Sequence, residues 1–200
     1  MATWSYLITS SAYPDGHYAL PGNALNVKNY LEAQGFNPGA IIGILANMEH
    51  ESYMNPGQQE IGYGGSPARG YGLVQWTPAS SKILAYAQSI PAAWYDGDVQ
   101  MDFLMINGPQ SWGMNISVTW DQYKQLNDIY YATRVFFYNF ERGTWTDDMY
   151  DYAAYWFNYI YGGTPPTPPD PPDPPDPPDP PGTETDWLML LALKLAKAYK

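Results

Sequence analysis

The sequence predicts a mainly α-helical (α+β) domain with a small β insertion, and two observations lead to this class. The long stretches with a clear hydrophobic period all have the period of a helix. The stretch 55–72, in contrast, is dense in glycine and has no helical period, so we expect a loop with a small β-hairpin there. The chain has 200 residues, 45% of them hydrophobic, which is enough for one domain with a real core.

Capping side chains and prolines mark where the expected helices begin. Asn23 caps a helix that runs through Gln34 and stops at Gly35. Asn37 caps the next one, with Pro38 in its first position. We expect a later helix over 77–89, which starts at a Thr-Pro pair. Three more, over 98–107, 128–142 and 147–162, each start at an aspartate.

Composition divides the chain into three parts. Residues 1–163 form the globular domain, and residues 164–182 repeat Pro-Pro-Asp. Because proline fixes φ and the aspartates repel one another, we expect an extended polyproline linker there. Residues 183–200 predict one short amphipathic helix with its basic residues at the C-terminal end.

Charge and residue counts exclude several classes of function. The net charge of -11 argues against nucleic acid as a substrate, because phosphate binding needs clustered Lys and Arg. The chain has no cysteine and only His17 and His50, too few ligands for a zinc peptidase, so we expect no metal and no other cofactor. The N-terminus lacks the basic region of a signal peptide, and no segment has the length of a membrane span.

The end of the helix that begins at Pro38 is the strongest candidate for chemistry. Its apolar stripe follows the spacing i, i+3, i+4, i+7 and consists of Ile41, Ile44, Leu45 and Met48. Glu49 and Glu51 fall on opposite flanks of that stripe, so either one can be half-buried and keep its proton. The periodicity does not choose between them, and a solvated glutamate is the plainer alternative for each.

Glycoside cleavage needs a carboxylic acid as proton donor and can use a second carboxylate. Glu60, in the glycine-rich stretch, is a candidate for the second role, although a solvated loop charge is the plainer interpretation. Gln75 and Trp76 stand just before a helix start, where an amide and an indole suit a sugar ring; a core position is the alternative for Trp76. For Glu141 and Arg142 we favour an ion pair or pairing with a helix end over a direct ligand role.

These residues resemble the phage tail lysozyme family, over about residues 23–161. The likeness rests on Asn47-Met48-x-x-Glu51-Ser52-x-x-Asn55-Pro56-Gly57, on Gly70-x-Gly72-Leu73-Val74-Gln75-Trp76-Thr77-Pro78-Ala79-Ser80, and on Phe137-x-x-Phe140-Glu141-Arg142. The resemblance implies a lysozyme-like fold and hydrolysis of the β-1,4 bond between N-acetylmuramic acid and N-acetylglucosamine. It implies that the glutamate followed by serine, Glu51, is the general acid. Ser52, Tyr71, Gly72, Gln75 and Trp76 are the substrate-binding residues that we expect around it.

The family implies bacterial peptidoglycan as the partner and a virion-associated or extracellular location, acting on the host cell wall. Residues 183–200 then dock on a phage tail protein or a membrane surface; packing on the main domain or on a sister chain is the alternative. Two other functions stay open. A lytic transglycosylase can use the same glutamate alone, and a non-catalytic wall-binding or virion module can keep the fold without the activity.

Overall fold

A computed structural model describes residues 2–167, and these residues are mainly helical, as predicted. Most of the predicted linker and the whole of the predicted C-terminal helix, residues 168–200, lie outside the described residues. The described helices are α1 (Pro21–Ala33), α2 (Pro38–Ser52), α3 (Ile83–Ser89), α4 (Gly97–Ser111), α5 (Trp120–Tyr123), α6 (Ile129–Phe136) and α7 (Asp148–Tyr161). A 3₁₀ turn, η1 (Ala79–Ser81), precedes α3, and a π-helix, η2 (Phe137–Glu141), continues α6.

Several predicted helix starts are confirmed. The Asp128 carboxylate accepts hydrogen bonds from the backbone N–H groups of Tyr130 and Tyr131, 2.9 and 3.0 Å away, and so caps α6. The helix α2 begins at Pro38 after Asn37. The Asn37 side chain does not cap it, however, because its amide donates to the carbonyl of Gln125 at 2.9 Å.

Other predicted boundaries are wrong, and tertiary contacts explain why. Asn23 lies inside α1, fully buried, where its amide donates to the carbonyls of Ser5 and Met54. The cap of α4 is Asp96, since the Asp98 carboxylate accepts from the Trp4 indole at 2.9 Å instead. That helix also runs past Asn107 to Ser111.

Two further departures concern the region around the glycine-rich loop. The predicted helix 77–89 is broken at Lys82, whose backbone (φ -120°, ψ -108°) separates η1 from α3. In place of the predicted hairpin, the described residues contain only isolated β-bridges. Two of them, Gln59 to Tyr71 and Tyr71 to Trp76, lie around the glycine-rich stretch, and a third joins Thr9 to Gln58. Dense glycine, which weakens strands, explains why pairing extends no further.

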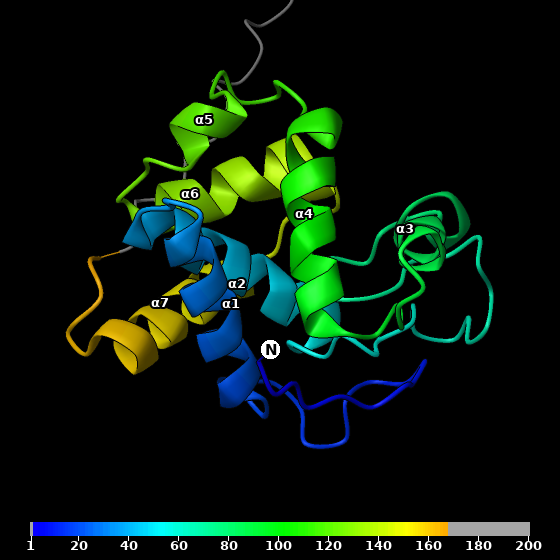
Figure 1. Ribbon diagram of the computed structural model, residues 1–200. Helices are drawn as coiled ribbons and strands as arrows, with labels where there is room; N and C mark the ends of the chain where they lie inside the picture. The colour runs from blue at the N-terminus through cyan, green and yellow to red at the C-terminus, as the bar shows by residue number, and fades with distance from the viewer. Residues whose placement is uncertain (1, 168–200) are drawn as a thin grey trace, which may run out of the picture. The chain divides into compact units, whose positions relative to one another are not determined.

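Helix α2 is the centre of the core. It packs against α1, α6 and α7, and Figure 1 shows it in the middle of the helices, with the upright α4 nearby and α3 at the right. Gly43 permits the crossing with α6, because a Cβ there would lie 2.7 Å from the backbone of Ala132. The buried Asn47 amide joins the same two helices by donating to the carbonyls of Gly43 and Thr133, at 2.7 and 3.2 Å.

The segment before α1, residues 2–19, contains no helix and is held by side chains of the core. Asn55 accepts a hydrogen bond from the Leu7 N–H at 3.0 Å and donates to the Leu7 carbonyl at 2.7 Å.

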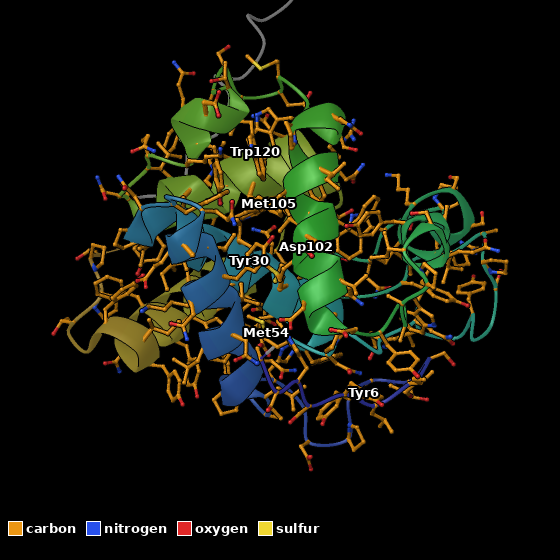
Figure 2. All side chains as sticks on the ribbon, in the orientation of Figure 1. Tyr6, Tyr30, Met54, Asp102, Met105 and Trp120 are labelled. Atoms are coloured by element: carbon orange, nitrogen blue, oxygen red, sulfur yellow. The ribbon has the colours of Figure 1, made fainter. Side chains whose placement is uncertain are left out.

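Helices α1 and α4 are joined by a side-chain hydrogen bond, which Tyr30 of α1 donates to Asp102 of α4 at 2.7 Å; Figure 2 labels both residues. Within residues 2–167, no helix has the length and apolar character needed to cross a membrane.

Candidate functional site

The ends of several elements meet around one pocket of about 350 Å³. They are the last turn of α2, the turn that follows the glycine-rich loop, the break before α3, and the ends of α4 and η2. Among the side chains that line it are seven with charged groups, amides or an indole: Glu51, Glu60, Gln75, Trp76, Lys82, Glu141 and Arg142. The polar lining and the open mouth suit a hydrated, hydroxyl-rich ligand.

Glu51 stands in the last turn of α2, half-buried, with its carboxyl group on the pocket. Burial raises its pKa to about 7, because removing water penalises the charged carboxylate. None of the ion pairs among residues 2–167 involves it, so no cation opposes that effect directly. A large share of Glu51 is therefore still protonated near neutral pH, in contrast to a carboxyl group in water.

Glu49 lies two residues earlier and does not line the pocket. It is fully buried, and its Oε1 accepts from the Tyr18 N–H at 2.8 Å and contacts His17 Nδ1 at 3.0 Å. Burial raises its pKa, while the Tyr18 and His17 contacts work against that rise. His17 reaches on to the Tyr152 hydroxyl, 3.2 Å from its Nε2. The two glutamates are thus separated by geometry: one faces the pocket and one is part of a buried polar network.

Glu60 lines the same pocket from the glycine-rich loop. Its carboxylate forms an ion pair with Arg69 at 3.3 Å and accepts from the Gly70 N–H at 3.1 Å. Arg69 in turn lies over the Tyr63 ring, 3.9 Å from its centroid. Glu60 is therefore an anchored carboxylate at the pocket, neither deeply buried nor free of partners.

The Gln75 backbone takes a positive φ of 45°, unusual for a residue other than glycine. Its amide donates to the carbonyl of Gly72 at 2.9 Å, which holds the turn that brings Gln75 to the pocket. Trp76 also lines the pocket but is only 2% exposed and packs on Phe103, 5.3 Å between ring centroids. Trp76 thus belongs to the core and to the pocket wall at once.

The other predicted substrate-binding residues support the wall from behind. Ser52 is fully buried, and its hydroxyl lies 2.9 Å from the carbonyls of Met48 and Leu73, which ties α2 to the turn. Gly72 has φ 85° and packs against Gln100, where a Cβ would lie 2.7 Å from the amide. Tyr71 is 4% exposed and packs on Trp94. None of the three lines the pocket.

Three charged residues that the sequence did not assign to the site also line it. Glu141 is the last residue of η2, and its Oε1 is buried without a hydrogen-bond partner within the described residues. Arg142 donates to the carbonyls of Phe140 and Ser111, at 3.4 and 3.2 Å, which agrees with the predicted pairing at helix ends. The alternative prediction, an ion pair between Glu141 and Arg142, is not found among residues 2–167. Burial and the nearby Arg142 lower the pKa of Lys82. An acidic residue directly after the aromatic run 136–140 was the signal in the sequence for Glu141.

Among residues 2–167, no group of three or more His, Asp or Glu side chains is close enough to hold a metal ion. The pocket itself presents carboxyl groups, an amide and cationic side chains.

The fold and the pocket together define a lysozyme-like helical domain, in which a half-buried acid at a helix end faces a polar pocket. The chain belongs to the phage tail lysozyme family, whose model matches residues 22–160. It is also 44% identical over 61 residues to morphogenesis protein 1 of Bacillus phage B103. That stretch covers 30% of this chain and 17% of the phage protein, so the chain spans a small part of that relative's length.

Proposed function

We propose that this protein is a muramidase that cleaves the β-1,4 bond between N-acetylmuramic acid and N-acetylglucosamine in bacterial peptidoglycan. The observation that carries the proposal is Glu51: a carboxyl group on a polar pocket whose pKa burial raises to about 7. Membership of the phage tail lysozyme family supports the same reaction class.

In the proposed reaction, Glu51 donates its proton to the glycosidic oxygen as the bond from that oxygen to the sugar's anomeric carbon breaks. The hydrolytic route ends when a water oxygen bonds to the anomeric carbon and the water proton leaves to a base. Glu60 is the candidate second carboxylate for that base, because the Arg69 ion pair fixes it on the same pocket. Gln75 and Trp76 form the wall against which the sugar lies.

The test is a digest of purified peptidoglycan, followed by mass spectrometry of the released fragments. The wild-type protein is expected to release fragments with reducing N-acetylmuramic acid ends, and Glu51→Gln to release none. Fragments with 1,6-anhydro ends would replace the hydrolase by a lytic transglycosylase. Binding to peptidoglycan with no fragments from the wild type would support a non-catalytic module and refute the proposal.

The pH dependence follows from the sign of the Glu51 shift. The protonated form is the active one, so activity is expected to fall as the pH rises through about 7. A rate that stays level from neutral to alkaline pH would contradict the role of Glu51 as the proton donor.

We propose that the protein acts on the host cell wall, from the virion or the extracellular side; the family and the phage relative support this proposal. Phage tail proteins are the expected assembly partners. Comparing wild-type virions with virions that carry the chain cut after residue 167 would test whether residues 168–200 are needed for incorporation.

A further inference from the structure

The pocket holds one acid that the proposed reaction does not use. Glu141 lies at the end of η2, on the pocket that also contains Glu51. A π-helix within an α-helix is a rare feature, found often at functional sites, because its wider turn redirects the side chains that follow. Here η2 brings Glu141, its last residue, to the pocket, and Arg142 follows it with a left-handed backbone, φ 59°.

The cations nearest to Glu141 in the pocket do not pair with it. Arg142 gives its hydrogen bonds to backbone carbonyls, and neither Arg142 nor Lys82 belongs to an ion pair within the described part of the chain. The Glu141 Oε1 is left buried without a partner. The Trp76 indole N–H, on the wall of the same pocket, is also buried and unpartnered.

Glu141 is half-buried, with its Oε1 out of contact with water and, within residues 2–167, no cation paired to it. These surroundings favour the neutral acid, since ionising the group would place an uncompensated charge partly out of water. Burial raises the pKa of Glu141 well above its usual range, and the nearby Glu51 adds to the rise, while Lys82 and Arg142 oppose it. A neutral carboxylic acid has an O–H that donates a hydrogen bond, which a carboxylate lacks.

We propose that Glu141 is a substrate-binding residue of this pocket: a neutral acid beside Glu51 that donates a hydrogen bond to an oxygen of the amino sugar. The inference rests on the proposed function, because a sugar chain must enter the pocket. Hydroxyl and acetamide carbonyl oxygens of N-acetylated sugars are acceptors of the required kind. The partner that Glu141 lacks within the protein is then supplied by the substrate.

The experiment compares Glu141→Leu with Glu141→Gln. Leucine removes the hydrogen bond and keeps the bulk, whereas glutamine keeps both a donor and the neutral charge. Binding of solubilised, uncross-linked peptidoglycan strands is measured by titration calorimetry in the Glu51→Gln background, so that no strand is cut. Glu141→Leu is expected to weaken binding about 10-fold, the effect of one lost hydrogen bond, and Glu141→Gln to restore most of it.

Two further measurements separate this role from a structural one. Thermal unfolding of Glu141→Leu should occur at the same or a higher temperature than in the wild type, because an apolar group replaces a buried, unpartnered polar one. In the active background, Glu141→Gln should keep the decline of activity near pH 7, because no charge has been removed next to Glu51.

The inference is overturned if Glu141→Leu binds strands as tightly as the parent protein, or if its weaker binding is matched by a lower unfolding temperature. It is also overturned if Glu141→Gln binds as poorly as Glu141→Leu, since that would require an ionised carboxylate. If strands bind but wild-type protein releases no fragments, the proposed function fails and the binding comparison still decides the role of Glu141. If no strands bind, the inference fails, and the digest with wild-type protein still decides the proposed function by itself.

Discussion

Glu49 and Glu51 stand two residues apart on α2, yet their surroundings differ in kind. Glu49 is fully buried and held by the Tyr18 N–H and the His17 ring. Glu51 is half-buried and lines a pocket, and nothing but burial shifts its pKa. Burial raises the pKa of both groups, but only the Glu49 carboxyl has hydrogen bonds that oppose the rise.

The comparison teaches that a raised pKa does not by itself identify an acid that donates a proton to a substrate. Access matters as much, because the proton must be within reach of the substrate. Burial of Glu49 contributes to stability instead. Its Oε1 accepts a hydrogen bond from the Tyr18 N–H and so joins the segment before α1 to α2, the helix at the centre of the core.

The largest expected effect is on activity. Glu51→Gln should lower the rate of peptidoglycan digestion about 10³-fold, within the range of a lost general acid. The matched change Glu49→Gln should leave the rate per folded molecule within a few-fold of the wild type, since Glu49 does not reach the pocket. Reducing-end release at pH 6, with the folded fraction measured by circular dichroism, makes the comparison. Equal losses in the two variants would remove the distinction between them.

The next effect is on stability and is expected on the other glutamate. Glu49→Ala leaves the Tyr18 N–H and the His17 ring without their buried acceptor, which should cost about 2–3 kcal/mol of unfolding free energy. Urea denaturation at constant pH measures it. Glu49→Gln is the control, because its amide oxygen can still accept from Tyr18, and its loss should be clearly smaller. A loss below about 1 kcal/mol for the alanine variant would contradict a stabilising role for the hydrogen bonds of Glu49 with Tyr18 and His17.

Glu51→Gln, in contrast, should raise the free energy of unfolding. The unfolded chain ionises this group at its ordinary pKa of 4.5, and the folded chain at about 7, so wild-type stability falls as the pH rises between these values. The variant has no such group, so its free energy of unfolding should exceed that of the wild type by up to about 3 kcal/mol above pH 7 and by little below pH 4.5. Urea midpoints taken at pH 4 and pH 8 provide the check. An equal gain in unfolding free energy at pH 4 and pH 8 would mean that the raised pKa of Glu51 is not its cause.

The smallest effect is expected at the far end of the Glu49 network. Tyr152→Phe removes the hydroxyl that lies 3.2 Å from His17 Nε2, which should cost about 1 kcal/mol. Because His17 keeps its contact with Glu49, the loss should be well below that of Glu49→Ala in the same urea assay. Comparable losses would instead mean that the three side chains act as one unit.

The sequence was enough to predict the helices whose ends carry local signals. Pro38 and Asp128 mark starts that the structure confirms, and α7 ends before Gly162. The pattern also placed both glutamates on the flanks of the α2 stripe. It could not assign their burial, because Glu49 is covered by His17 and Tyr18, which come from a segment without any period.

The parts that could not be predicted depend on irregular backbone. Helical spacing assumes 3.6 residues per turn, and η2 departs from it just before Glu141, so the direction of that side chain cannot be derived from the pattern. Lys82 reaches the pocket because the expected helix is broken at that residue. The predicted hairpin failed for a related reason, since the glycine-rich stretch is held by single bridges and side chains.

The link through His17 also bears on synthesis at the ribosome. His17 lies before the first described helix, and Tyr152, with which it stacks at 4.8 Å between ring centroids, lies in α7, the last described helix, so the ribosome adds the two residues far apart in time. Tyr18 stacks in the same way on Tyr155, at 3.8 Å. A nascent chain therefore cannot complete the cover over Glu49 until α7 has emerged, so folding of the whole domain must wait for its last helix.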